Sequence, residues 1–176
     1  MASDEALFER LVQGDIGAFD ELYERHERHL FGFILRHVGD RYEAEDVLHE
    51  AFMAVLRERD RGRSATSFRA WLFQVARNLC LNRQRTRRRA ARAFESVARA
   101  PSEPAEHPER ALVEHQAAES LERAISRLPT ALAELYQLRA GGMSYDELAE
   151  VLAIPVGTVK SRMHRMVSLL REEMLP

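Results

Sequence analysis

Residues 144–165 read SYDELAEVLAIPVGTVKSRMHR, two short amphipathic segments with a break between them. Ser144 and Glu147 stand three residues apart in the pattern of a capping box, which predicts a helix over 144–152. The break at 153–157 holds a proline and a glycine, and a second helix is expected from Thr158 to about Glu173. Two short helices joined by a tight turn predict a helix-turn-helix.

The second of these helices has two chemically different faces. At about 100° per residue, one side carries apolar residues and the opposite side carries hydrogen-bond donors. The apolar side holds Val159, Met163, Met166, Val167 and Leu170, and the opposite side holds Lys160, Ser161, His164 and Arg165. An ordinary solvated face is the alternative, but the capped helix and turn before it favour a helix that reads base edges in the major groove.

Outward from this stretch, helical spacing of apolar residues dominates and no segment alternates with a period of two, so the chain is predicted to be all-α. Asp40 and Glu43 predict a capped helix start, and Ser67 is a predicted N-cap. A polar loop is expected from Arg57 to Ser67. Apolar stripes with helical spacing run over 19–38, 47–55, 68–79, 121–128 and 132–138, and each predicts a helix. The helix over 68–79 is expected to continue into a basic extension that holds Asn82 and the following arginines.

The composition of the middle of the chain indicates two small helical domains joined by a flexible linker. Residues 98–110 hold Pro101, Pro104 and Pro108 among small and acidic residues, a composition that buries little apolar surface. The expected organisation is a first domain over 1–91, an acidic flexible linker over 92–112 and a second domain over 113–176.

The overall composition excludes several classes of protein. The chain has 176 residues, 45% of them hydrophobic, and one cysteine, Cys80, so no internal disulfide can form. No apolar run approaches the roughly 18 residues of a membrane span, and the acidic N-terminus does not resemble a signal peptide. These features predict a cytoplasmic protein without membrane insertion.

Charge is strongly segregated along the chain although the net charge is only -2. Residues 1–50 carry -8, residues 51–92 carry +10, residues 93–135 carry -4, and the remainder is neutral. Seven arginines and no acidic residue occur between 77 and 92. Such a block predicts that one part of the chain contacts a polyanion while another contacts something else.

Several motifs together resemble a known family, the extracytoplasmic-function (ECF) group of bacterial sigma factors. The helix-turn-helix is similar to the family's region 4, and two upstream segments are similar to its region 2. The similar segments are Ile154–Arg165, Leu128–Pro129 and Met143–Ala149 for region 4, and Ala44–Phe52, Ser67–Leu72 and Ala76–Leu79 for region 2. The resemblance covers roughly residues 10–173.

This resemblance implies a dissociable specificity subunit of core RNA polymerase. Region 2 would bind the polymerase clamp and melt the −10 element of promoter DNA, a loop at about 60–66 would capture a flipped-out base, and region 4 would read the −35 element. An anti-sigma factor is an expected partner. The acidic linker would thread a polymerase channel that is built to hold nucleic acid.

The residues expected to carry these roles form three sets. The polymerase-binding set is Asp46, His49, Glu50 and Leu56. The −10 set is Asn78 and Asn82 for base edges, with Arg77, Arg83, Arg85 and Arg87 for phosphates. The −35 set is Thr158, Lys160, Ser161, Arg162, His164 and Arg165. Phe68 and Trp71 fall on the apolar stripe and are expected in the core.

Two other classes of function are alternatives for this sequence. An enzyme would need a catalytic or metal site, and the pairs His26/His29 and Glu45/His49 have spacings that a metal could use. No complementary ligand set accompanies them, so no catalytic residue, cofactor or metal is predicted. A stand-alone helix-turn-helix regulator is the other alternative, but its expected dimer surface is replaced by the region 2 motifs.

Overall fold

The structure is a computed structural model, and it describes residues 2–61, 67–94 and 121–174. These residues form helices and turns without a strand, which confirms the predicted all-α fold. A helical turn also occupies 121–126. The helices are α1 (Asp4–Val12), α2 (Gly17–Val38), α3 (Arg41–Arg61), α4 (Phe68–Phe94), α6 (Thr130–Ala140), α7 (Tyr145–Leu152) and α8 (Val156–Met174).

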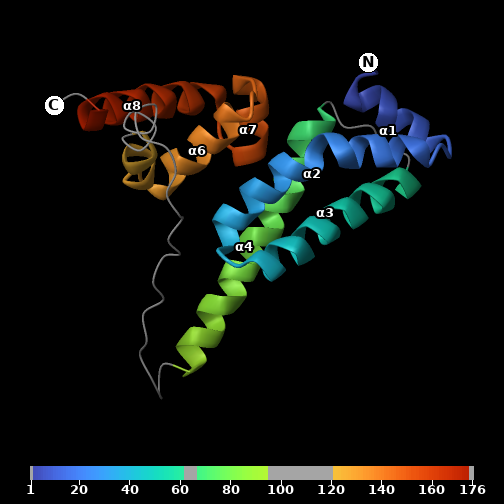
Figure 1. Cartoon of the computed structure of the whole chain (residues 1–176), viewed down its shortest axis with the longest axis horizontal. Helices are drawn as coiled ribbons and strands as arrows, with labels where there is room; N and C mark the ends of the chain where they lie inside the picture. The colour runs from blue at the N-terminus through green and yellow to red at the C-terminus, as the bar shows by residue number, and fades with distance from the viewer. Residues whose placement is uncertain (1, 62–66, 95–120, 175–176) are drawn as a thin grey trace, which may run out of the picture.

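The N-terminal helices form a bundle in which α2 contacts α1, α3 and α4 (Figure 1). The predicted apolar stripes face one another in its core. Phe68 is 1% exposed, and burying a side chain of this size contributes roughly 2–3 kcal/mol. The same core buries side chains from three helices: Leu22 and Ile34 of α2, Val47 and Phe52 of α3, and Leu72 and Ala76 of α4.

Helix α1 is an addition to the helices expected from the sequence. Ser3 caps it by accepting a hydrogen bond from the Ala6 amide, and Leu7 and Leu11 are fully buried. Asp4 in its first turn pairs with Arg25 at 3.0 Å and with His26 at 2.7 Å. The polar contacts and the apolar stripe together hold α1 against α2.

Helix α3 is longer than the sequence predicted, and α4 includes the whole basic extension that the sequence placed after its apolar stripe. Helix α3 continues to Arg61, where a loop was expected from Arg57, and α4 continues through the arginine block to Phe94. Arginine is a good helix former, and ion pairs to α3 support the extension. Of the expected capture loop at 60–66, residues 62–66 lie outside the described residues. Residues 95–112 of the expected linker also lie outside the described residues, whereas residues 92–94 belong to α4.

The C-terminal helices confirm the predicted helix-turn-helix. Ser144 and Glu147 form a complete capping box at the start of α7. Ala153 ends α7 in the left-handed conformation, with φ of 53°. Helix α8 begins at Val156, two residues before the expected start at Thr158.

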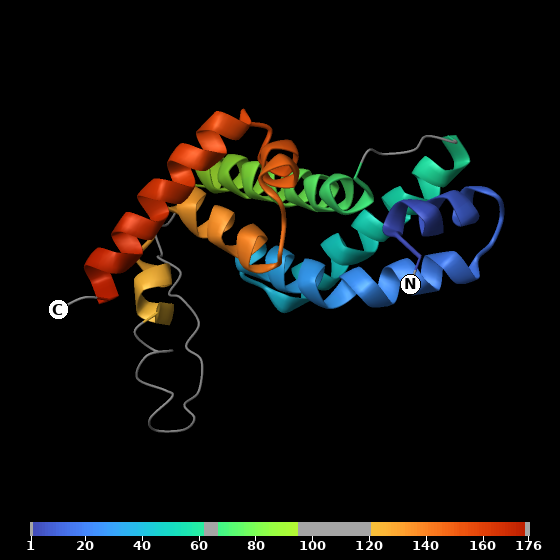
Figure 2. The ribbon, with the colours of Figure 1, turned by 90° about the horizontal axis from the view of Figure 1, so that it is seen from above.

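The two groups of helices pack against each other, which the sequence did not predict. Helix α7 lies against α4, and α8 packs on α6 and α7. Figure 2 shows α6 and α7 beside α4, with α8 and α1 toward opposite ends of the molecule. Apolar residues of α6 and α7 belong to the same buried cluster as the core of the N-terminal bundle. No helix within the described ranges has the length and apolarity needed to cross a bilayer.

Candidate functional site

The first candidate surface is the outward face of α3. Asp46, His49 and Glu50 are exposed, and Leu56 is half-buried. Glu50 also forms an ion pair with Arg83 of α4. The structure therefore brings the four residues of the predicted polymerase-binding set onto one helix, with one of them linked to the neighbouring arginine block.

Two apolar residues extend this face and were missed in the sequence. Tyr42 is 79% exposed and Met53 is 52% exposed. With Asp46 and His49 they follow the spacing 42, 46, 49 and 53, which places all four on one side of the helix. Tyrosine and methionine are enriched at protein interfaces, so these two exposed side chains favour a protein partner for this face. A helical projection of 42–53 would have revealed them.

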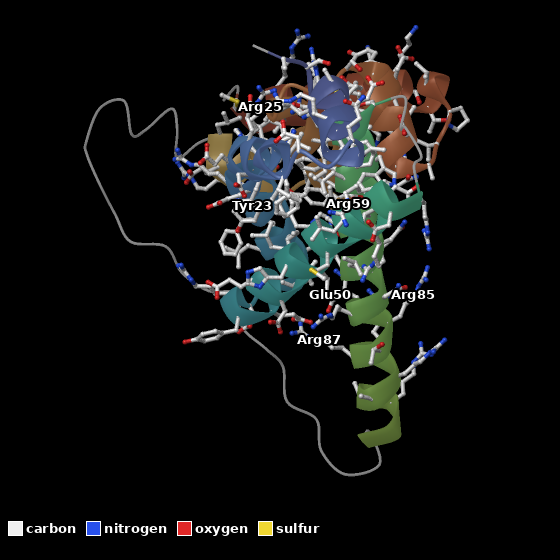
Figure 3. All side chains as sticks on the ribbon, turned by 90° about the vertical axis from the view of Figure 1, so that its right-hand side faces the viewer. Tyr23, Arg25, Glu50, Arg59, Arg85 and Arg87 are labelled. Atoms are coloured by element: carbon white, nitrogen blue, oxygen red, sulfur yellow. The ribbon has the colours of Figure 1, made fainter. Side chains whose placement is uncertain are left out.

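The second candidate surface is the basic half of α4. Asn78 and Asn82, one helical turn apart, are both exposed, as are Arg85 and Arg87. Arg87 donates to the carboxylate of Glu43 and to the carbonyl of Val38 at 3.0 Å. Figure 3 shows Arg87 on the side of α4 that faces α3 and Arg85 on the opposite side.

The pairing with α3 divides the arginine block into two sets. Arg83 and Arg87 are anchored by Glu50 and Glu43, although each guanidinium keeps further N–H donors. Arg85, Arg88, Arg89 and Arg92 are exposed and form no ion pair within the described part of the chain. These four arginines are available to a polyanion.

Arg77 lies apart from the rest of the predicted −10 set. Its side chain is 21% exposed and donates to the Glu134 carboxylate of α6 through Nε at 2.6 Å and through Nη2 at 3.3 Å. His37 of α2 reaches the same carboxylate at 3.2 Å through Nε2. Burial alone would raise the pKa of Glu134, but hydrogen bonds from His37 and Arg77 lower it below its ordinary value.

The third candidate surface is the N-terminal half of α8. Lys160, Ser161, His164 and Arg165 are exposed, and Thr158 and Arg162 are half-buried. Val159 and Met166 are buried and attach the helix to α6 and α7. Val167, which was expected on the buried side, is 37% exposed. The predicted −35 set therefore forms one face of donors at the start of the helix, where backbone amides also point outward.

Across residues 2–61, 67–94 and 121–174, no group of three or more His, Cys, Asp or Glu side chains could hold a metal ion. Cys80 is fully buried, and burial raises the pKa of its thiol to about 12. A thiol in this state is not a nucleophile near neutral pH.

Two protein families match this chain. The family described as Sigma-70 region 2 matches residues 22–90, and the family described as Sigma-70, region 4 matches residues 118–170. The first match contains α3 and most of α4, and the second contains the helix-turn-helix. The α3 and α8 surfaces lie inside the two matched regions, as does the α4 surface up to residue 90.

Curated relatives match along nearly the full length. The RNA polymerase sigma-H factor of Pseudomonas aeruginosa is 32% identical, over 98% of this chain and 94% of the relative. The ECF RNA polymerase sigma-E factor of Escherichia coli K12 is 30% identical, over 99% of this chain and 95% of the relative.

Solved structures share the fold. The sigma factor RpoE of Bartonella quintana, solved with the anti-sigma factor NepR, is 25% identical with a TM-score of 0.68, over 89% of this chain and 96% of that chain. CnrH, solved with the cytosolic domain of CnrY, has a TM-score of 0.66 at 24% identity, over 97% and 96% of the two chains. On its sequence relatives and matched regions, the chain belongs to the ECF group of bacterial sigma factors, alternative sigma subunits that direct the initiation of transcription.

Proposed function

We propose that this sigma factor binds core RNA polymerase through α3, holds the −10 element along α4 and reads the −35 element with α8. The observation that carries the proposal is the distribution of three exposed faces over two matched regions. An acidic and apolar face suits a protein, because its carboxylates would repel DNA. An arginine row and a donor-rich helix start suit promoter DNA.

The role of each set follows from its chemistry. The polymerase contact would be formed by the α3 face, which holds Asp46, His49, Glu50 and Leu56 together with Tyr42 and Met53. Asn78 and Asn82 would hydrogen-bond to base edges of the −10 element, and Arg83, Arg85 and Arg87 would neutralise phosphates with the arginines that follow them. On α8, Lys160, Ser161, His164 and Arg165 would contact bases or backbone of the −35 element, with Thr158 and Arg162 at the edge of the face.

The proposed division of the chain follows the same scheme. Residues 1–91 would act as region 2, residues 113–176 as region 4, and residues 92–112 as the linker. The chain would supply recognition and no catalytic step of its own, since RNA polymerase carries out the synthesis. It would act in the cytoplasm with the polymerase. An anti-sigma factor is a proposed further partner, because the Bartonella structure holds one.

Transcription with purified core polymerase on a library of bacterial genomic fragments tests the proposal. We expect start sites that share two sequence elements, found only when the sigma factor is added. Tight and specific binding to duplex DNA without polymerase, with no start sites in its presence, would instead indicate a stand-alone regulator.

Single substitutions separate the polymerase contact from DNA recognition. Asp46→Lys reverses a charge on the α3 face and should weaken binding to core polymerase at least tenfold, whereas Glu24→Lys makes the same change on the exposed side of α2 and should not. Equal binding by the two variants would remove α3 from the proposed interface.

A matched pair on α8 tests the −35 assignment. Arg165→Ala should cost about 1–3 kcal/mol at one −35 position and relax the base preference there. Arg171→Ala, an exposed arginine in the last turn of the same helix, should leave the preference unchanged. Loss of affinity that is uniform over all −35 sequences would make Arg165 a phosphate contact.

A further inference from the structure

Gln84 and Arg87 of α4 form a clasp on the turn that joins α2 to α3. Gln84 donates through Nε2 to the carbonyl oxygen of His37 at 2.8 Å, and Arg87 donates through Nη1 to the carbonyl oxygen of Val38 at 3.0 Å. Both carbonyls belong to the last turn of α2, where a helix has no donor of its own left for them. Figure 1 shows α4 running beside this turn. The end of α2 is therefore held by two side chains of α4.

The same guanidinium also holds the first turn of α3. Arg87 donates through Nη2 to the carboxylate of Glu43, whose side chain is 12% exposed. A carboxylate with so little exposure needs a partner, and Arg87 supplies one. Asp40 accepts a hydrogen bond from the Glu43 amide at 2.8 Å, as the capping pattern predicts. The Glu43 side chain turns to α4, so Arg87 bridges the last residue of α2 and the first turn of α3.

The turn between the two helices is short. Gly39 has φ of 77°, in the left-handed region that glycine adopts without strain, and its amide donates to the Leu35 carbonyl at 2.8 Å. Only Gly39 and Asp40 separate helices of 22 and 21 residues. With so short a connection, a movement of the end of α2 also moves the start of α3.

The first turn of α3 carries one end of the proposed polymerase contact. Tyr42 is 79% exposed there, and Asp46, His49 and Met53 continue the face along the helix. Helix ends fray more readily than helix interiors, and a side chain on a frayed turn must be ordered when it binds. A turn that is ordered in advance removes this cost from association. The clasp therefore preorganises the end of the face on which Tyr42 lies.

We propose that Gln84 and Arg87 are positioning residues for polymerase binding, which clasp the α2–α3 turn and thereby hold Tyr42 in place for core polymerase. This role rests on the proposed function of the α3 face, whereas the clasp itself does not. It goes beyond the phosphate contact assigned to Arg87. The guanidinium keeps further N–H donors for a phosphate, so the two roles do not exclude each other.

Hydrogen exchange of the full chain tests the clasp. Arg87→Ala removes the bridge while keeping a good helix former, and the amides of residues 41–44 should exchange at least about threefold faster than in the wild type. Arg36→Ala, at an exposed site in the last turn of α2, removes the same charge beside the same turn and should not change their exchange. Unchanged exchange in Arg87→Ala would overturn the proposal.

Binding to core polymerase in the absence of DNA tests the positioning role. Arg87→Ala should weaken binding about three- to tenfold, the effect of losing roughly one hydrogen bond to a charged group. Glu43→Gln breaks the ion pair of the bridge from its other side and should also weaken binding, whereas Arg36→Ala should bind like the wild type. Equal affinity for wild type, Arg87→Ala and Glu43→Gln would overturn the positioning role.

A double-mutant cycle separates positioning from a general loss of structure. If Arg87 acts through Tyr42, then Arg87→Ala should cost little further affinity in a chain that already carries Tyr42→Ala. In a chain with Met53→Ala, about three helical turns further along the same face, Arg87→Ala should cost as much as in the wild type. Additive losses in both cycles would show that Arg87 does not act through Tyr42 and would overturn the proposal.

Failure of the proposed function has a different signature. If hydrogen exchange separates Arg87→Ala from the wild type but the wild type does not bind core polymerase, then the assignment of α3 to the polymerase fails. The positioning role fails with it, while the clasp on the α2–α3 turn stands.

Discussion

Ala153 is the residue whose backbone defines the turn between α7 and α8. Its φ of 53° lies in the left-handed region, which costs a non-glycine residue about 1–2 kcal/mol. The turn keeps this conformation because the flanking helices are fixed by the Ser144 capping box and by buried Val159. The strain is local, and one substitution can remove it.

Ala153→Gly should therefore stabilise the protein. Relief of the left-handed strain exceeds the added entropy of the unfolded chain, so the free energy of unfolding should rise by roughly 0.5–1 kcal/mol. Denaturant unfolding followed by circular dichroism measures the change. Ala149→Gly, inside α7, is the control and should lower stability by about 1 kcal/mol. A loss of stability with Ala153→Gly would contradict the strain argument.

His26 makes stability depend on pH. Burial lowers the pKa of His26 below the ordinary value of 6.5, an effect that the neighbouring Asp4 only partly offsets. The unfolded chain therefore takes up a proton at this site at higher pH than the folded chain does. The contribution of His26 to stability is complete above about pH 6.5 and declines as the pH falls through the folded pKa.

The measurement is the free energy of unfolding at pH 7.5 and at pH 5.5. His26→Gln should lose less stability between these values than wild type, because the site no longer titrates. His29→Gln, an exposed histidine on the same helix, should behave like wild type. If His26→Gln keeps the full wild-type pH dependence, the protonation of other groups accounts for it.

At the scale of elements, α3 and α4 show how the segregated charge is arranged. The acidic segment of α3 and the arginine block of α4 each carry a large net charge, and they lie side by side. Glu43 pairs with Arg87, and Glu50 pairs with Arg83. Partial neutralisation lets the arginine block continue as one helix to Phe94 without strong self-repulsion. The unpaired side of α4 keeps the positive charge that DNA would meet.

This division predicts unequal roles for the arginines. Arg85→Gln removes an exposed cation without an acidic partner and should reduce the slope of log affinity against log salt for promoter binding by about one. Arg28→Gln, an exposed arginine on α2, should leave the slope unchanged. Binding of the assembled holoenzyme to labelled promoter at several salt concentrations measures the slope. An unchanged slope for Arg85→Gln would place that side chain away from the phosphates.

At the scale of the whole molecule, the shared apolar cluster couples the two regions. Leu148 of α7 and Leu72 of α4 are both fully buried in it, so unfolding of one region exposes apolar surface of the other. Calorimetry of the wild type should show one transition. Glu134→Lys, which places a cation against Arg77, should split it into two, and Glu172→Lys, at an exposed site near the end of α8, should not. Two transitions in the wild type would show that each region unfolds independently despite the contact.

The fold class, several helix starts and two of the candidate surfaces can be predicted from the sequence alone. Helical periodicity fixed the all-α fold, and capping residues such as Ser67 and Ser144 marked helix starts that the structure confirms. The faces of α3 and α8 followed as well, because a helix places residues three and four apart on one side. Helix α1 and the exposed apolar pair Tyr42 and Met53 were missed, and both are visible in a helical projection.

The packing of region 4 on region 2 was decided by tertiary structure. Glu134 is 57 residues from Arg77 and 97 from His37, and no local pattern relates groups so far apart. Sequence could assign Arg77 to a basic block, but only folding showed that its guanidinium is held by a carboxylate of the other region. The physical reason is that periodicity records what each helix buries, whereas the partner it is buried against depends on the free energy of the whole packed chain.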